Sequence, residues 1–434
     1  ERMDIIMKNS QQRRRVVVTG IGLVTPLGLD VPSTWAAARA GKVGIGPLTK
    51  VDIPTINVRV AGEVRGWVPE DYFPAREARR MDLVTQYGVV AAREAFAMAG
   101  LVAARVDEDG SSTPGNFDQE AAGVIASTGI GGLFTIEKDH TVGMTRGFER
   151  VSPFFVPMSI VNITAGTIAI EFGLYGQATC VVTACAASTN GIGDAFRVIR
   201  DGYQDLMIAG GTESSVTEMG IAGFSALRAL SNSHDPERAS IPFDKDRDGF
   251  VLGEGAGMLV LEELEHARAR GATILAEITG YAATCDAYHI TAPHPEARQV
   301  ARCMTQCLAD GGHSVTEVDY INAHGTSTQL NDVTETRAIR LALGEHADRV
   351  AVSSTKSMTG HLLGGSGAVE AALTILALRD QVAPPTATLK VPDPECDLDY
   401  VPGTGRPMEL NLALSNSLGF GGHNACLAFR RWTE

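Results

Sequence analysis

The order of apolar and polar residues divides the chain into strand-like and helix-like segments that alternate from residue 14 onward. Short runs rich in β-branched and apolar residues are typical of buried strands, and the amphipathic or small-residue segments between them are typical of helices. This alternation predicts an α/β protein with a mostly parallel or mixed sheet covered by helices. Helices are expected at residues 31–40, 297–311, 332–343 and 364–379, and one more begins at residue 186.

Two halves of the chain are weakly similar to one another. In the first half the run VVTAC leads into a helix of small residues, and in the second VSSTKSMTGH leads into LLGGSGAVEAALTI. Each run places a reactive side chain, Cys185 or His361, just before its helix. We therefore expect an N-terminal half over residues 14–270 and a C-terminal half over residues 271–434, with both side chains at a shared interface. Residues 1–13 are expected to be unstructured or foreign to the native chain.

Composition narrows the class of protein. The 434 residues are 44% hydrophobic and 20% charged, which is typical of a globular protein. The net charge of −14 argues against a nucleic-acid partner, and the absence of any run of about 18 apolar residues argues against a membrane span. Seven scattered cysteines without a CxxC pair argue against a disulfide framework or a zinc site, and they favour a reducing, cytoplasmic location.

Cys185 is the most informative single residue. The β-branched run before it and the small residues after it predict a strand, a tight elbow and a helix, with the thiol at the helix N-terminus. Free backbone N–H groups and the helix dipole stabilise an anion there, so we expect a lowered pKa and a nucleophilic thiolate. A cysteine after an apolar strand is equally often a core residue, so the rest of the chain has to decide between the two interpretations.

Three further motifs carry reactive residues: INAHGTSTQLND with His324, STKSMTGHLLGGSGAVE with Lys356 and His361, and SNSLGFGGHN with Phe420. Each alone fits a structural role, such as a hydrogen-bonded histidine, a solvated lysine or a glycine turn. Together, one cysteine and two histidines at strand ends favour acyl transfer through a thioester, with two imidazoles that stabilise an oxyanion or enolate. Serine hydrolysis is the competing chemistry, but the sequence has no GxSxG elbow at a predicted strand–helix turn to support it.

These motifs resemble a known family. TAC at residues 183–185, NAHGTST at 322–328, STKSMTGHLLG at 354–364 and GFGGHN at 419–424 are similar to the motifs of β-ketoacyl-[acyl carrier protein] synthases, and most similar to the elongating type of bacterial type II fatty acid synthesis. The resemblance runs from about residue 14 to residue 431. It implies a thiolase-type fold, with a duplicated α-β-α-β-α core in five layers, that acts as a homodimer and binds acyl carrier protein.

The resemblance also implies an activity, that of a 3-oxoacyl-[acyl-carrier-protein] synthase, with type 2 the best match. Cys185 would hold the acyl chain, and His324 and His361 would stabilise the enolate formed when malonyl-acyl carrier protein loses CO2. The backbone N–H groups of Cys185 and Phe420 would form the oxyanion hole. The supporting network is expected to comprise Lys356, Asp332 and Glu335.

Substrate and cation sites follow from the same resemblance. The phosphopantetheine arm of the carrier is expected at Thr326 and Thr328, and the acyl chain at Ile130 and Phe224, with Phe420 as a gate. No cofactor of its own is required, because the carrier brings the phosphopantetheine. Docking of the carrier is expected at Arg76, Arg79, Arg80 and Arg228. A structural Na⁺ or K⁺, or equally a buried hydrogen-bond network, is expected at Asn322, Glu370, Ser415 and Asn416.

Three related functions are alternatives. A type II polyketide ketosynthase has overlapping motifs, although a lone chain without fused domains favours fatty acid synthesis. A non-catalytic chain-length partner replaces the active cysteine, so the intact Cys185 argues against it. A degradative thiolase needs a second catalytic cysteine near the C-terminus, where this chain has the Phe420 loop instead.

Overall fold

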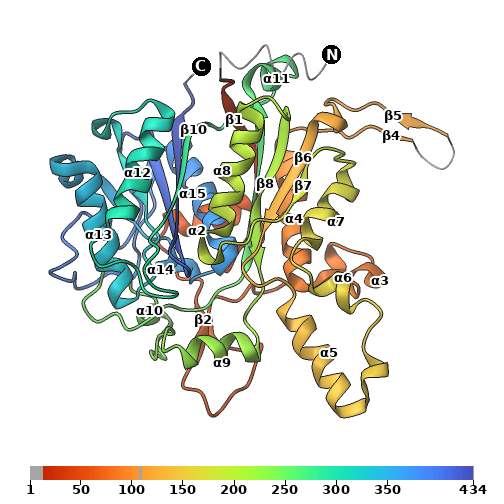
Figure 1. The fold of residues 1–434 in the computed structure, drawn as a ribbon, viewed down its shortest axis with the longest axis horizontal. Coiled ribbons are helices and arrows are strands. Elements are labelled where there is room, and N and C mark those ends of the chain that lie inside the picture. The colour runs from red at the N-terminus through yellow and green to blue at the C-terminus, as the bar shows by residue number, and fades with distance from the viewer. Residues whose placement is uncertain (1–12, 107–109, 434) are drawn as a thin grey trace.

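A computed structural model describes residues 13–106 and 110–433, so nearly all of the predicted N-terminal segment 1–13 lies outside the described residues. Ten strands form one sheet in the order β12-β11-β15-β16-β10-β1-β9-β8-β6-β7 (Figure 1). The first half of the chain contributes β1 (Val16–Val24), β6 (Ala122–Ser127), β7 (Ala178–Thr179), β8 (Leu206–Glu213) and β9 (Gly255–Glu263). The second half contributes β10 (Ala276–Cys285), β11 (Tyr320–Asn322), β12 (Ala351–Ser353), β15 (Leu412–Gly419) and β16 (His423–Arg431).

The two halves of the sheet have the same topology. In the first half β7, β6 and β8 are parallel, and β9 and β1 follow with antiparallel pairing. In the second half β12, β11 and β15 are parallel, and β16 and β10 follow with antiparallel pairing. The two halves join where β1 and β10 pair antiparallel, with Val16 opposite Ile278. The predicted duplication is therefore present in the strand order itself.

A matching irregularity marks both central strands. The register shifts at Gly20 in β1 and at Gly280 in β10, and a threonine precedes each glycine. A Cβ at Gly20 would lie 2.1 Å from the carbonyl oxygen of Ala95, and one at Gly280 would lie 2.2 Å from that of Cys307. Only glycine lets the covering helix approach the strand so closely, which explains the choice of residue at both positions.

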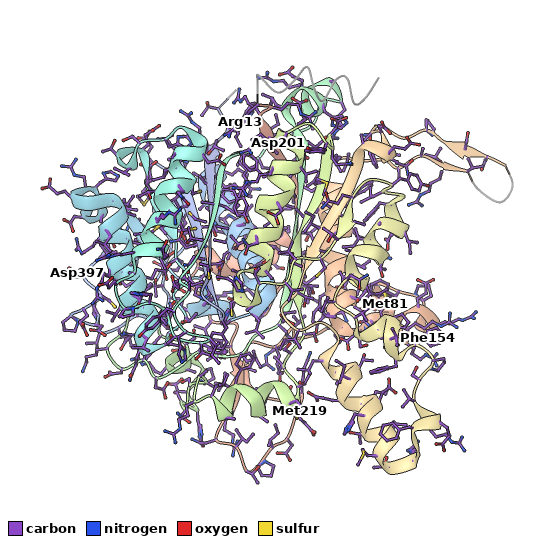
Figure 2. The ribbon with its side chains drawn as sticks, viewed as in Figure 1. Arg13, Met81, Phe154, Asp201, Met219 and Asp397 are labelled. Atoms are coloured by element: carbon purple, nitrogen blue, oxygen red, sulfur yellow. The ribbon has the colours of Figure 1, made fainter. Side chains whose placement is uncertain are left out.

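Helices cover and separate the two halves in layers. Two lie outside the first half, two outside the second, and two between the halves (Figure 1). The outer pairs are α4 (Leu83–Met98) with α7 (Ile163–Phe172), and α12 (Arg298–Gly311) with α13 (Gln329–Leu343). The central pair is α8 (Ala187–Arg200) and α15 (Ser366–Asp380). This gives the five layers α-β-α-β-α that the resemblance implies, and side chains fill the spaces between them (Figure 2).

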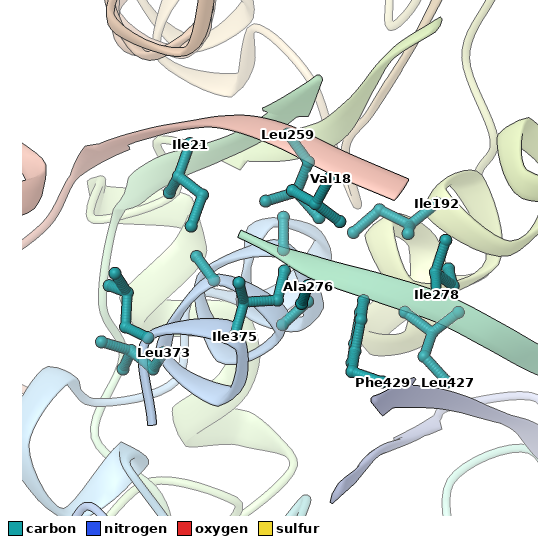
Figure 3. Close-up of a cluster of buried hydrophobic side chains, with 14 of the residues drawn as sticks. Val18, Ile21, Ile192, Leu259, Ala276, Ile278, Leu373, Ile375, Leu427 and Phe429 are labelled. Carbon is teal, nitrogen blue, oxygen red and sulfur yellow. The ribbon is translucent and has the colours of Figure 1, made fainter. Parts of the chain in front are cut away.

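Apolar side chains form a core on each side of both sheet halves. The central core joins β1, β9, β10 and β16 to the inner faces of α8 and α15, and Figure 3 shows part of it around Ile192 and Ile375. Burial on this scale is the main favourable contribution to folding, because each fully buried aliphatic side chain contributes about 1.5–3 kcal/mol.

The two central helices pack against one another and begin in the same way. Ser188 of α8 accepts a hydrogen bond of 2.9 Å from the backbone N–H of Ala368 in α15. Each helix follows a short 3₁₀ turn whose first residue has a positive φ, 50° at Ala184 and 46° at Leu363. The predicted shared interface therefore holds, and it places Cys185 beside the segment that carries His361.

One predicted strand is wrong in length. Pairing of β7 with β6 ends at Thr179, and residues 181–183 of the VVTAC run continue without a strand partner among the described residues. β7 is the edge strand, and β6 is its one partner among the described residues. The side chain of Val182 is 48% exposed as a consequence.

The remaining helices and strand pairs surround this core. The helices are α2 (Val31–Arg39), α3 (Ala75–Ala78), α5 (Leu133–Arg146), α6 (Phe155–Ser159), α9 (Glu218–Ala226), α10 (Pro236–Ala239), α11 (Leu264–Ala269) and α14 (Lys356–Thr359). The strand pairs are β2 (Gly46–Pro47) with β3 (Val60–Ala61), β4 (Arg105–Val106) with β5 (Ser112–Thr113), and β13 (Val382–Ala383) with β14 (Arg406–Pro407). Across the described parts of the chain, no helix has both the length and the apolar character needed to span a membrane.

Candidate active site

A cavity of about 310 Å³ opens between the two halves. Cys185 reaches it from the turn before α8, and His324 from the segment after β11. His361 reaches it from the segment between α14 and α15, and Phe420 from the loop between β15 and β16. Both halves of the duplication thus supply reactive side chains to one space. Of the predicted binding residues, the cavity is also lined by Phe224, Arg228, Thr326 and Thr328.

The two histidine rings lie almost perpendicular, with their centroids 5.3 Å apart. Lys356 Nζ lies 3.4 Å from Nδ1 of His324. An ammonium group only donates hydrogen bonds, so this Nδ1 accepts and the ring N–H is assigned to Nε2. His361 Nδ1 lies 3.0 Å from Oγ of Ser366, which also accepts from the N–H of Leu362. Because Ser366 Oγ already accepts from Leu362, we assign its hydroxyl as the donor to this Nδ1, so His361 too carries its N–H on Nε2.

Both histidines are neutral hydrogen-bond donors at neutral pH. Burial lowers the pKa of His324 well below its ordinary value, and the charge of Lys356 and the ring of His361 add to this effect. Burial followed by the charge of Lys356 does the same to the pKa of His361. A neutral imidazole N–H stabilises a developing oxyanion without first having to bind a proton.

Lys356 is buried, although a lysine before a helix is ordinarily solvated. It is only 1% exposed and forms an ion pair with the carboxylate of Glu370. Glu335 accepts hydrogen bonds of 2.8 Å from the backbone N–H groups of His324 and Gly325, and so fixes the loop behind the first histidine. Burial raises the pKa of Glu335 and of Glu370 to about 7.

Asp332 does not belong to the network around Lys356, which corrects one prediction. Its carboxylate accepts from the backbone N–H of Phe243 at 2.8 Å and lies 3.5 Å from the guanidinium of Arg247. Asp332 lies one helical turn before Glu335 on the same face of α13. Its carboxylate is held by Phe243 and Arg247 instead, and it acts on Glu335 only through its charge.

The thiol of Cys185 does not have the lowered pKa that its position before a helix predicts. Burial raises its pKa to about 12. Three groups oppose this change, namely the charge of Lys356 and the backbone N–H groups of Phe420 and of Cys185 itself. Desolvation outweighs them, because an anion in a dry site loses more hydration than a few donors replace. The resting residue is a thiol, and the two N–H groups are aimed at its sulfur.

The loop that carries Phe420 lies directly against the turn that carries the thiol. A Cβ on Gly419 would lie 2.6 Å from the carbonyl oxygen of Thr183, so only a glycine permits this contact. The Phe420 ring lies 6.5 Å from that of Phe224, and Phe224 packs edge-on against Phe250 at 5.3 Å. Phe420 therefore lines the cavity beside Phe224 and Phe250.

An apolar cluster surrounds the thiol on the side of α9. Cys185, Ile130 and Phe224 all belong to it, as the predicted acyl site requires. Thr326 and Thr328 also line the cavity, and their hydroxyl oxygens are 2.8 Å apart. The cavity at the sulfur is thus lined by both apolar and polar side chains.

Four predicted cation ligands each bury an oxygen atom without a hydrogen-bond partner. Asn322 of β11 lies directly opposite Ser415 of β15, and its amide donates to the backbone oxygen of Glu370. The unpartnered atoms are Asn322 Oδ1, Glu370 Oε2, Ser415 Oγ and Asn416 Oδ1. Buried oxygens are rarely left unpaired, so each of these four atoms is a candidate ligand for a cation.

The predicted docking arginines occupy two places. Arg228 lies at the cavity, just after α9, whereas Arg76, Arg79 and Arg80 lie on or just after α3 and are exposed. The Arg80 guanidinium lies 4.5 Å from the centre of the Phe154 ring. The four arginines therefore come from two separate elements, and only Arg228 lines the cavity itself.

Sequence reasoning missed Ser366, Phe250 and Glu213. Ser366 orients His361, and Phe250 packs edge-on against the same ring at 5.1 Å. Both lie in runs of small or apolar residues that resemble ordinary core. Glu213 had a usable signal, because it is an acid at the end of the fully apolar run LMIAGGT.

Comparison with known sequences gives a consistent result over the whole chain. The family model described as "Beta-ketoacyl synthase, N-terminal domain" matches residues 13–267, and the corresponding C-terminal domain matches residues 275–390. The 3-oxoacyl-[acyl-carrier-protein] synthase 2 of Synechocystis sp. is 51% identical and covers 97% of this chain and 99% of its own length. The protein of the same name from Staphylococcus aureus strain COL is 49% identical, with the same coverage.

Solved structures agree on the fold. A β-ketoacyl synthase from Burkholderia phymatum has a TM-score of 0.86 at 35% identity, and covers 97% of this chain and 100% of its own. A ketosynthase complex with a type II polyketide acyl-carrier protein has a TM-score of 0.87 at 33% identity, with the same coverage. The predicted thiolase-type fold is confirmed by these neighbours.

Replacing Lys356 by methionine tests the electrostatics of the site. Removal of the ammonium raises the pKa of Cys185 further, so alkylation of this thiol by iodoacetamide should slow at each pH, about tenfold for every pH unit by which the pKa rises. Peptide mapping separates Cys185 from the other cysteines. Lys50→Met is the matched control, because Lys50 pairs with the buried Glu254 away from the cavity. An unchanged rate in Lys356→Met would contradict the assignment.

Proposed function

The chain belongs to the beta-ketoacyl synthase family, and on that premise we propose how its residues perform the condensation. It is a 3-oxoacyl-[acyl-carrier-protein] synthase, an acyltransferase that elongates fatty acids by two carbons. The observation that carries the mechanism is one cavity that contains a thiol and two neutral imidazole donors. These are the groups needed for a thioester nucleophile and for an enolate.

The first step loads the acyl chain. Sγ of Cys185 attacks the thioester carbonyl of acyl-acyl carrier protein, and the carbon–sulfur bond to the carrier breaks. The thiol proton passes to the departing carrier sulfur, so the transfer needs no permanent base. The N–H groups of Cys185 and Phe420 are the proposed donors to the oxyanion, because both act on the sulfur and the oxyanion forms on the carbon bonded to it.

The second step forms the nucleophile from malonyl-acyl carrier protein. The bond to the carboxylate breaks and releases CO2, and its electron pair moves onto the thioester oxygen as an enolate. His324 and His361 each donate Nε2–H to that oxygen. Burial and Lys356 keep both rings neutral, so both are donors at the pH of the cell.

The third step forms the new carbon–carbon bond. The enolate carbon attacks the acyl carbonyl on Cys185, the carbon–sulfur bond breaks, and the 3-oxoacyl product leaves two carbons longer on the carrier. The departing sulfur takes up a proton from solvent water, which is the one proton that the condensation consumes. The raised pKa of Cys185 favours this uptake and returns the site to the thiol form.

Fatty acid synthesis is favoured over polyketide synthesis. The curated relatives named 3-oxoacyl-[acyl-carrier-protein] synthase 2 are 49–51% identical to this chain, whereas the type II polyketide ketosynthase complex is 33% identical. All these proteins share the fold, so the geometry does not distinguish the two pathways. The higher sequence identity to the fatty acid synthases is what favours that pathway.

Acyl carrier protein is the partner, and we propose where it docks. Exposed Arg76, Arg79 and Arg80 form a local basic patch on a chain of net charge −14, and a basic patch attracts an acidic partner. Arg228 at the cavity and the Thr326–Thr328 pair are placed to bind the phosphopantetheine arm as it enters. The patch lies beside Phe154, which Figure 2 labels and whose ring the Arg80 guanidinium covers.

We also propose a structural monovalent cation. Asn322, Glu370, Ser415 and Asn416 supply only neutral oxygens and one carboxylate, a set that suits Na⁺ or K⁺. Glu335 and Glu370 are two buried carboxyl groups near one buried ammonium, and a bound cation would favour the ionised form of both, whose pKa burial raises to about 7. Such an ion would fix the strand ends behind the histidines.

The assembly is proposed to be a homodimer that works in the cytoplasm. β7 is the edge strand of the sheet and lies beside α7 (Figure 1). Large apolar side chains are exposed on α7 and on the preceding helices α5 and α6. Ile170 is 85% exposed and Tyr175 is 73% exposed. A second copy that pairs at this edge would cover both.

The seven free cysteines support the proposed cytoplasmic location, which is a reducing compartment, and cell fractionation tests it.

Two variants test the reaction. In Cys185→Ser the rate of condensation should fall by more than about a thousandfold, because a serine hydroxyl is a much weaker nucleophile without an adjacent base.

His361→Asn should slow release of ¹⁴CO2 from labelled malonyl-acyl carrier protein by about a hundredfold, since an enolate donor is lost. Retained elongation in the first variant, or an unchanged rate of CO2 release in the second, would refute these roles.

Charge reversal tests the docking patch. Arg79→Glu with Arg80→Glu should raise KM for acyl carrier protein substrates about tenfold or more and leave KM for small thioester mimics unchanged. Raised salt should reduce the difference between wild type and variant. An equal rise for carrier and mimic would show that the patch acts on something other than docking.

Exchange of the buffer cation tests the proposed ion. Thermal unfolding in a buffer with tetramethylammonium as its only cation should occur several degrees lower than in Na⁺ or K⁺, because the large ion cannot enter the buried site. The comparison is made at constant ionic strength. Identical melting in all three buffers would favour the buried hydrogen-bond network instead.

Sedimentation equilibrium tests the dimer. The native protein should sediment at twice the mass of one chain, and Ile170→Asp with Tyr175→Asp should shift it toward the monomer. A native protein that sediments as a monomer at micromolar concentration would contradict the proposal.

A further inference from the structure

Glu213, the last residue of β8, is a fully buried carboxylate that the mechanism above does not use. Its two oxygens accept five hydrogen bonds, all from neutral groups. The donors are the N–H groups of Gly129 at 2.8 Å, Gly364 at 3.1 Å and Ile130 at 3.3 Å, and the hydroxyls of Ser215 at 3.0 Å and Thr128 at 3.3 Å. Only a carboxylate, whose atoms are all acceptors, satisfies five donors at once.

These donors belong to two parts of the site. Gly129 and Ile130 lie in the loop after β6, and Ile130 packs in the apolar cluster around Cys185. Gly364 lies in the turn between His361 and α15, which comes from the other half of the duplication. Glu213 is thus bonded to the acyl side of the site and to the segment that carries one of the enolate donors.

The two segments touch through their backbones. A Cβ on Gly364 would lie 2.1 Å from the backbone nitrogen of Gly129, so nothing larger than hydrogen fits between them. Both N–H groups point to the same oxygen, Oε2 of Glu213. A movement of either segment away from the other therefore breaks a hydrogen bond to a buried charge, which is costly in a dry site.

Glu213 also acts on the thiol through its charge. The groups that face Cys185 are Lys356, whose charge lowers the thiol pKa, Glu213, whose charge raises it, and the neutral rings of His324 and His361. The carboxylate and the ammonium thus shift the pKa of the thiol in opposite directions. Burial of a carboxylate without a cationic partner lowers the stability of the fold. The presence of an acid at this position therefore points to a role in the site.

We propose that Glu213 is a positioning residue, which holds the acyl-chain pocket and the His361 turn together as one unit and balances the charge of Lys356 at the thiol. It acts through Ile130, Gly364 and Cys185 rather than on substrate. This inference rests on the proposed function, since the pocket and the turn are defined by the condensation.

Two substitutions at Glu213 separate its reach from its charge. Glu213→Asp keeps the charge but is one methylene shorter and cannot reach both segments. Glu213→Gln keeps the length, removes the charge and turns an NH2 group toward N–H donors. Glu94→Gln is the matched control, because Glu94 also accepts from two backbone N–H groups, those of Leu23 and Val31, away from the cavity.

Two readouts are compared in protein whose folding is checked by thermal melting. In both Glu213 variants, kcat/KM for a long acyl chain should fall at least about fivefold more than for a short chain, because a long chain needs the intact pocket. In Glu213→Gln alone, alkylation of Cys185 should move to lower pH and speed up about threefold to tenfold at pH 8. Glu94→Gln should match wild type in both.

Each readout decides one part of the proposal. An unchanged ratio of long-chain to short-chain kcat/KM in folded Glu213 variants overturns the positioning role, and an alkylation profile of Glu213→Gln that coincides with wild type overturns the charge balance. Alkylation does not depend on turnover, so a wild type that forms no 3-oxoacyl product would count against the proposed function alone. If neither variant folds, Thr128→Val removes one donor to Glu213 and should change the chain-length ratio in the same direction.

Discussion

The buried ammonium of Lys356 is the group on which the rest of the site depends. It pairs with Glu370, donates to His324, and lowers the pKa of His324, His361 and Cys185. A buried charge is tolerated only where it is paired and hydrogen-bonded, so its neighbours are fixed in number and kind. The proposed cation and the proposed role of Glu213 both follow from this one buried charge, which also adds to the burial that keeps the histidines neutral.

Duplication of the fold is what brings this charge to the thiol. Each half ends a set of parallel strands at a short turn with one positive-φ residue, followed by a central helix. Because α8 and α15 pack side by side, the turn with Cys185 faces the segment with His361. The second half adds His324, Lys356 and the Phe420 loop. Neither half contains a complete site, so burial between them creates both the dry cavity and the reactive constellation.

Much of this was predictable from local patterns. The alternating strands and helices, the two small-residue helices, and the grouping of Cys185, His324, His361, Lys356 and Phe420 all rest on short motifs that local sequence dictates. The pKa of Cys185 was not predictable in this way. The position of the thiol before a helix predicts a lowered pKa, and only burial in the folded protein raises it. Asp332 and Glu335 lie one turn apart but face different partners, which spacing alone does not reveal. The roles of Ser366 and Glu213 depend on contacts between distant segments that no local pattern records.

Mass spectrometry of Cys185 during turnover tests the central claim most directly. Incubation with acyl-acyl carrier protein should add the mass of the acyl group to the peptide that contains Cys185. Addition of malonyl-acyl carrier protein should then remove that mass and yield a 3-oxoacyl carrier two carbons longer. A 3-oxoacyl product formed while Cys185 stays unmodified, or an acyl group that malonyl-acyl carrier protein does not discharge, would contradict the account.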